Sequence, residues 1–216
     1  MSAPHACTAA ASTTDRGRKK SFWQQFGEPT GVMGWLVGHL MAIKNRERSQ
    51  WLLPLLDVRA NARVLEIGFG PGVDVKRIST AAPGVHVVGI DHSAEMVRQA
   101  RKRNGAGVRA GRVDLRRGSV CPLPFPEATF DRAFAVNNVQ FWPDRAAGFA
   151  ALHRVLKSNG LLAIAIQPRN PGATAATTRE WAERLRAEMQ QAGFEHVRAE
   201  FHEMRPVPVV CVLGNK

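Results

Sequence analysis

The residues best able to do chemistry stand together in the stretch VLEIGFGPGVDV, residues 64–75. An apolar run that carries Glu66 near its end is followed by glycines at every second position, Gly68, Gly70 and Gly72. Glycine loses more conformational freedom on folding than any other residue, so three in one short turn predict a backbone that bends sharply or lets a ligand approach closely. The stretch is therefore a candidate ligand-binding loop with a carboxylate beside it.

A dinucleotide-binding loop is the first alternative for this glycine pattern. That motif requires the spacing G-x-G-x-x-G, in which the last glycine lets a helix pack closely on the strand. Here Gly72 follows Gly70 after one residue, and Val73 stands where the last glycine of the motif would be. The spacing therefore argues against a nicotinamide dinucleotide as the ligand.

A second acid, Asp91, ends the run VVGID, 19 residues after Gly72. A carboxylate at the end of a second strand can accept hydrogen bonds from both hydroxyls of a ribose. Local roles remain open for both acids. Asp91 could cap the helix expected to begin near Ser93, and Glu66 could interact with the positive N-terminus of the helix after the glycine loop.

Alternating strands and helices must position these residues. The apolar patterns predict strands at 63–67, 85–90, 111–118, 130–136 and 161–167. Helices are predicted between them at 72–81, 93–104 and 144–157. Such alternation requires parallel strands joined by right-handed crossovers, hence a doubly wound α/β sheet. A last helix at 177–192 ends at Gly193 and precedes strands at 195–203 and 207–213, whose short connection permits only an antiparallel hairpin.

Composition divides the chain into three parts. Residues 1–20 are small, polar and basic, which predicts a disordered tail, and residues 21–60 carry a helical pattern that we expect to form an N-terminal lid. Residues 61–216 form the α/β domain. The most apolar run, 31–43, is shorter than the roughly 20 residues of a membrane-spanning helix, so we expect no stable membrane insertion. Three cysteines without C-x-x-C spacing suit a reducing compartment, so we expect a cytoplasmic protein. As a separate expectation, the protein is a monomer or a homodimer.

The arrangement E-x-G-x-G-x-G resembles the first motif of class I S-adenosylmethionine-dependent methyltransferases, and residues 62–168 follow the order of the small-molecule, methyltransferase domain 11-like type. The resemblance implies a Rossmann-like sheet of seven strands, mostly parallel with an antiparallel C-terminal hairpin, and S-adenosyl-L-methionine as cofactor. It also implies that the acid in the first strand attracts the sulfonium and amino group of the cofactor. The implied cofactor-binding residues are Glu66, Gly68, Gly70, Gly72, Asp91, His92, Met96, Ser119, Val120 and Asn137.

One of these positions departs from the family pattern. The family usually has Asp where this chain has Ser119, in the segment before the fourth strand. A hydroxyl can still accept from the adenine amino group, but one charge-assisted hydrogen bond is lost.

The resemblance further implies where a methyl acceptor binds, because the family selects substrates with its N-terminal helices and with the loops after the fourth and fifth strands. In-line attack on an activated methyl depends mainly on positioning and on exclusion of water, so no catalytic residue is assigned. His39 on the lid is the one histidine that we would test as a base, and no cluster has the spacing of a metal site. The residues expected on the substrate side are Phe22, Phe26, Trp35, Asn138, Gln140, Trp142 and Arg169. A structural role stays open for Asn137 and Asn138, which could instead satisfy backbone groups at the end of the fourth strand.

A formal net charge of +12 keeps a second function open, methylation of a nucleic acid such as RNA. Enzymes that methylate the amino groups of bases usually carry a [DNS]-P-P-[YFW] motif after the fourth strand, where a flipped base stacks. This chain has NNVQ there, residues 137–140, which favours a small-molecule acceptor. A third alternative is a non-catalytic cofactor-binding or membrane-surface protein in which segment 31–43 lies on lipid.

Overall fold

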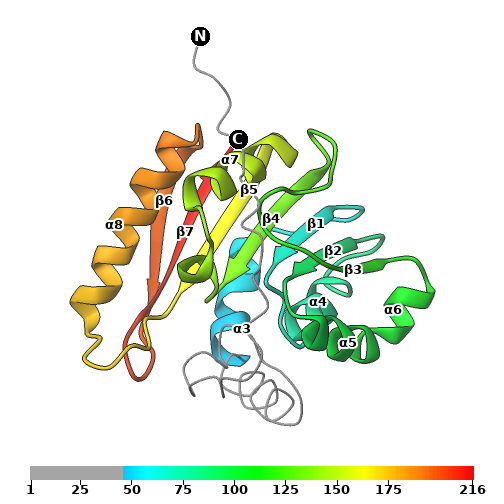
Figure 1. Ribbon diagram of the computed structural model, residues 1–216, viewed down its shortest axis with the longest axis horizontal. Coiled ribbons are helices and arrows are strands. Elements are labelled where there is room, and N and C mark those ends of the chain that lie inside the picture. Colours follow the sequence, from blue (N-terminus) through cyan, green and yellow to red (C-terminus); the bar gives the residue numbers. More distant parts are fainter. Residues whose placement is uncertain (1–45) are drawn as a thin grey trace, which may run out of the picture.

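Seven strands pair in the order β3-β2-β1-β4-β5-β7-β6 in the computed structural model, which describes residues 46–216 (Figure 1). The strands are β1 (Arg63–Ile67), β2 (His86–Asp91), β3 (Val113–Arg117), β4 (Phe130–Val136), β5 (Leu156–Ile166), β6 (Glu195–His202) and β7 (Val209–Asn215). The helices are α3 (Arg46–Leu55), α4 (Val73–Ile78), α5 (Ala94–Arg103), α6 (Gly105–Arg109), α7 (Arg145–Val155) and α8 (Ala175–Gln191), with a short 3-10 helix η1 (Val139–Phe141).

The pairing of the strands confirms the predicted doubly wound, mostly parallel sheet. β1 pairs in parallel with β2 on one side and with β4 on the other, and the pairs β2–β3 and β4–β5 are parallel as well. β7 runs antiparallel to both β5 and β6, which confirms the C-terminal hairpin. The strand order reverses between β1 and β4, and ligands of such sheets bind beyond the carboxyl ends of the strands at this reversal.

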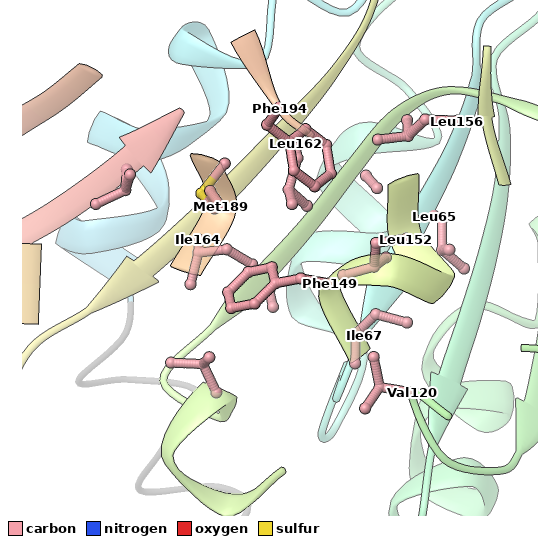
Figure 2. Close-up of a cluster of buried hydrophobic side chains, with 14 of the residues drawn as sticks. Leu65, Ile67, Val120, Phe149, Leu152, Leu156, Leu162, Ile164, Met189 and Phe194 are labelled. Atoms are coloured by element: carbon pink, nitrogen blue, oxygen red, sulfur yellow. The ribbon is translucent and has the colours of Figure 1, made fainter. Parts of the chain in front are cut away.

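Side chains of β1 alternate between two buried layers, because successive residues of a strand point to opposite faces of the sheet. Leu65 and Ile67 belong to the cluster under α7 and α8, in which Phe149 and Leu152 are buried (Figure 2). Val64 belongs to the other cluster, which is completed by residues of α3, α4 and α5. By the same alternation, Glu66 points to the face that α3 and α4 cover.

Most element boundaries shift by a few residues from the sequence prediction, and two differences are larger. The structure has an additional helix, α6, directly after α5, in the stretch between the predicted helix 93–104 and the predicted strand 111–118. Gly107 is required there by close packing, because a Cβ at this position would lie 2.7 Å from Cγ2 of Val113. Strand β5 begins at Leu156, before the predicted start, and its pairing with β4 shifts register between Phe130 and Arg132.

The predicted lid, residues 21–60, lies only partly within the described residues. Its last part forms α3. Leu52 on this helix and Leu56 directly after it are fully buried in the apolar cluster on this face of the sheet, so α3 belongs to the core. The predicted tail 1–20 and the candidates Phe22, Phe26, Trp35 and His39 lie outside the described residues. From residue 46 onward, no helix is long and apolar enough to cross a membrane.

Candidate active site

The three glycines of the loop after β1 have positive φ angles, +66° at Gly68, +53° at Gly70 and +72° at Gly72, which favour glycine over any other residue. A Cβ at Gly68 would lie 2.4 Å from Nδ2 of Asn138, and one at Gly72 would lie 2.7 Å from Cβ of Ala100. A Cβ at Gly70 would meet no described atom within 4 Å. Packing therefore requires the outer two glycines, while the middle one faces open space where a ligand can approach.

Asp91, at the end of β2, holds this loop from one side. Its Oδ2 accepts the backbone N–H of Gly70 at 2.8 Å, and its Oδ1 accepts that of Ser93 at 2.9 Å. Burial raises the pKa of Asp91, and these two N–H groups oppose that rise. Each carboxylate oxygen has a second lone pair, so Asp91 can shape the loop and still accept hydrogen bonds from a ribose.

Asn104, after the last turn of α5, holds the loop from the other side. Its Nδ2 donates to the carbonyl oxygen of Gly72 at 3.0 Å and to that of Ala100 at 2.9 Å. Arg103 adds a hydrogen bond from Nη1 to the carbonyl oxygen of Pro71 at 3.1 Å. Neither residue was predicted to belong to the site, because nothing in the pattern of α5 indicates that its end faces the loop.

The two asparagines after β4 bind neighbouring strands with their side chains. Asn138 donates from Nδ2 to the carbonyl oxygen of Ile67 at 2.5 Å and accepts at Oδ1 from Nε1 of Trp142 at 2.9 Å. Asn137, at φ +52°, accepts the backbone N–H of Gln167 at 2.8 Å. The side chains that the sequence assigned to cofactor and substrate thus join the carboxyl ends of β1, β4 and β5.

Glu66 is buried at 3% exposure, and its Oε2 has no hydrogen-bond partner among the described residues. Burial raises the pKa of Glu66 well above its ordinary value, and the charges of Asp74 and Asp91 raise it further. Helix α4 begins at Val73, its N-cap residue is Gly72, and no side-chain hydrogen bond caps it, so Glu66 does not cap this helix. An unpartnered buried acid of this kind suits a ligand that brings positive charge.

The remaining predicted cofactor residues line the ends of β2 and β3. The imidazole of His92 is half exposed, with Nδ1 lying 3.7 Å from Oδ1 of Asp91, and Ser119 is exposed. Met96 and Val120 are buried at 3% exposure each, and Val120 belongs to the core cluster under α7. Val120 can therefore offer a ligand its backbone, whereas its side chain fills the core.

The substrate candidates within residues 46–216 follow β4 and β5 at the same sheet edge. Gln140 is exposed and donates from Nε2 to the carbonyl oxygen of Asn137 at 3.0 Å. Trp142 packs against Phe149 with ring centroids 5.4 Å apart, and Arg169 donates from Nη2 to Oε1 of Gln167 at 2.8 Å. In the described part of the chain, no group of three or more His, Cys, Asp or Glu residues could hold a metal ion.

These features fit S-adenosylmethionine. Gly70 leaves room for the cofactor beside the strand end, and Glu66 supplies an unpartnered acid for its positive groups. Asp91 lies at the strand end where a ribose binds in such sheets.

Comparison with known proteins identifies a family that uses this cofactor. A methyltransferase domain model matches residues 64–160. The uncharacterized methyltransferase YdaC of Bacillus subtilis is 32% identical over 181 residues, which cover 84% of this chain and 98% of YdaC. The O-methyltransferase resE of Aspergillus sclerotiorum is 32% identical over 51% of this chain and 41% of resE. The ubiquinone/menaquinone biosynthesis C-methyltransferase UbiE of Citrifermentans bemidjiense is 31% identical over 60% of this chain and 56% of UbiE.

Solved structures share the fold. A SAM-dependent methyltransferase from Aquifex aeolicus superposes with a TM-score of 0.61 at 20% identity, over 77% of this chain and 88% of that protein. Phosphoethanolamine N-methyltransferase 2 of Haemonchus contortus, in complex with S-adenosyl-L-methionine, gives a TM-score of 0.61 at 22% identity, over 72% of this chain and 38% of that one. With the glycine loop, the two strand-end acids and a relative matched over nearly its whole length, the chain belongs to the class I S-adenosylmethionine-dependent methyltransferases.

Proposed function

We propose that this enzyme transfers a methyl group from S-adenosylmethionine to a small organic molecule that approaches over the carboxyl ends of β4 and β5. The relatives named as O-methyltransferase and as ubiquinone/menaquinone biosynthesis C-methyltransferase support an acceptor of this class. The acceptor side would be formed by the exposed ring of Phe141 together with Gln140, Trp142 and Arg169.

The observation that carries the proposal is the hydrogen bonding after β4. The side-chain amide of Asn138 is hydrogen-bonded to the carbonyl of Ile67 and to the indole N–H of Trp142. The side-chain oxygen of Asn137 accepts the backbone N–H of Gln167. In enzymes that methylate the amino group of a base, the loop at this position instead presents a polar group and an aromatic ring to the flipped base. Because its asparagine side chains are already hydrogen-bonded within the protein, the loop of this chain is better suited to forming one wall of a small-molecule site.

The basic stretch from Arg98 to Arg117 also favours a small-molecule acceptor over nucleic acid. Arg98 pairs with Glu95 at 2.7 Å, and Arg116 pairs with Asp114. The remaining arginines for which hydrogen bonds are found donate to backbone carbonyl oxygens; these are Arg101, Arg103, Arg112 and Arg117. Much of the charge is therefore engaged within the domain, which leaves less of it for phosphate contacts.

The residues of the chain contribute mainly position and charge. When bound, the cofactor supplies an activated methyl with a neutral leaving group, which an acceptor nucleophile attacks in line. Gly70 and Asp91 would hold the adenosyl end, and Glu66 would hold the positively charged methionyl end, so that the methyl is fixed in position for attack. An acceptor that is already nucleophilic requires no base, whereas a phenol or alcohol must lose a proton. His39, the predicted base, lies outside the described residues.

A screen with isotopically labelled methyl donor tests the proposal. The purified protein is incubated with labelled S-adenosylmethionine and, in separate reactions, with quinols, phenols, amines, thiols and mixed RNA. We expect label in at least one small-molecule class and background label in RNA, and mass spectrometry then locates the methylated atom. Label in RNA alone would contradict the proposal. A Gly70→Val variant is the control, because label that does not depend on the cofactor loop comes from a contaminant.

A further inference from the structure

Arg48, on α3, is fully buried and carries hydrogen-bond donors that the described residues do not use. Its one hydrogen bond runs from Nη1 to Oε1 of Gln167 and is long, 3.4 Å. Its Nε and Nη2 are buried and have no partner among residues 46–216. Burial of an unpaired guanidinium is costly, so an acceptor for these donors is expected.

Gln167 brings a second cation to the same place. Its Nε2 donates to the carbonyl oxygens of Arg205 at 3.1 Å and Val207 at 2.8 Å, which leaves its Oε1 facing Arg48 and Arg169. Two guanidinium groups thus converge on one neutral oxygen. Burial and, to a smaller extent, the charge of Arg169 together lower the pKa of Arg48 to about 10. Arg48 therefore stays protonated at neutral pH, and an anion bound here would relieve the repulsion.

The guanidinium of Arg48 comes from α3, the helix that covers the face of the sheet to which Glu66 points. Asp74, in the first turn of α4, accepts from Oγ of Ser49 at 2.8 Å and lies close enough to raise the pKa of Arg48. The same carboxylate raises the pKa of Glu66. Asp74 is thus near both groups, one a buried guanidinium with free donors and the other a buried acid with an unpartnered oxygen.

We propose that Arg48 binds the carboxylate of the methionyl group of S-adenosylmethionine, while Glu66 faces the ammonium of the same group. A zwitterionic amino-acid head carries one negative and one positive charge, which matches the two unpartnered groups. Gln167 and Arg169 then act as positioning residues for Arg48. The inference rests on cofactor binding and not on the nature of the acceptor, and it assigns α3, outside the matched segment 64–160, to the cofactor site.

Calorimetric titration without any acceptor tests the assignment by binding alone. The ligands are S-adenosylmethionine and decarboxylated S-adenosylmethionine, which keeps the adenosyl, sulfonium and amino groups and lacks only the carboxylate. We expect the wild-type protein to bind the complete cofactor about 10- to 100-fold more tightly, as for a charged hydrogen bond. Equal affinities for the two ligands in the wild-type protein would overturn the proposal without any variant.

An Arg48→Met variant then connects the preference to this side chain. We expect it to lose most of the discrimination between the two ligands while its affinity for the decarboxylated one stays within about twofold, and Arg48→Lys should keep part of the discrimination. Arg132→Met is the matched control, because Arg132 on β4 is a partly buried arginine that donates to the carbonyl oxygen of Leu56 at the opposite edge of the sheet. It should discriminate like the wild type.

Two results would contradict the role of Arg48. If Arg48→Met weakens both ligands equally, the side chain supports the fold and not the carboxylate. If both affinities are unchanged and only the KM of an acidic acceptor rises, the anion belongs to the acceptor. A wrong acceptor class would appear in the labelling screen and would leave these titrations unchanged, so the two proposals fail separately.

Discussion

The carboxylate of Asp91 accepts the backbone N–H of Gly70 at 2.8 Å, which joins the end of β2 to the loop after β1. The two residues belong to separate motifs, and the hydrogen bond makes them one structural unit. Gly70 is also the glycine of the loop that faces open space. The acid predicted to bind ribose therefore also sets the shape of the backbone against which the cofactor lies.

Replacing Asp91 with Ala should weaken binding of S-adenosylhomocysteine by about 1.5–3 kcal/mol, because hydrogen bonds to a charged group are lost in the loop and to the ribose. Asp91→Asn should fall between this variant and the wild type, since it keeps one acceptor oxygen. Titration calorimetry measures both affinities. Asp114→Asn, at a partly exposed position on β3, is the control and should bind like the wild type.

Gly70→Ala should lower the affinity for S-adenosylhomocysteine at least tenfold, because the added methyl would point into the space that the cofactor needs. Gly111→Ala is a matched control, since Gly111 has φ +68° and a Cβ there would also meet nothing within 4 Å. Each substitution places an L-residue at positive φ and should cost about 1–2 kcal/mol of stability. Equal affinities in the two variants, at equal loss of thermal stability, would contradict the role of Gly70.

Asn138→Ala should destabilise the protein by about 1–3 kcal/mol, because it leaves the carbonyl of Ile67 and the indole N–H of Trp142 without their partner. Trp142→Phe should cost less, and the double variant should lose less than the sum of the two single losses. Denaturant unfolding measures the three free energies. Strictly additive losses would mean that the two side chains are not coupled.

Glu66→Gln should stabilise the unliganded protein at neutral pH and weaken its binding of S-adenosylmethionine. Burial raises the pKa of Glu66, so between about pH 4.5 and its higher folded pKa the folded state keeps a proton that the unfolded chain has lost. Stability therefore falls as pH rises through this range. Thermal unfolding across pH should show a smaller fall in the variant, with the remainder due to Asp74 and Asp91, whose pKa values burial also raises.

The same shift predicts a proton release on binding. A ligand that brings positive charge beside Glu66 lowers the pKa of this carboxyl, so the wild type should release protons when it binds S-adenosylmethionine near neutral pH. Titrations in buffers of different ionisation enthalpy count those protons. A release that is unchanged in Glu66→Gln would place its source elsewhere and would contradict the assignment of Glu66.

The sheet and the glycine loop were predictable because their signals are local. The alternation of apolar residues gives each strand of the α/β sheet, and the spacing from Glu66 to Gly72 together with Asp91 identifies the family before any contact is known. Gly193, predicted to end the last helix, indeed has φ +91° just after α8. In each case the residue type reflects the backbone conformation of a short segment, which can be inferred without knowing the contacts of that segment.

What could not be predicted depends on contacts between distant segments. Asn104 reaches Gly72 across 32 residues, and Arg48 reaches Gln167 across 119. For Asn138 the sequence left a ligand contact and backbone hydrogen bonding both open, and it did not identify the two partners, the carbonyl of Ile67 and the indole of Trp142. Such roles arise only when the sheet brings the strand ends together, so the pattern of a single segment carries no sign of them.

The most direct measurement of the central claim is a calorimetric titration of the wild-type chain with S-adenosylmethionine, S-adenosylhomocysteine and NAD in parallel. The glycine loop and the two acids predict micromolar binding of both sulfur-containing ligands and no binding of NAD. Binding of NAD with no response to the other two would contradict the cofactor assignment and the site built on it.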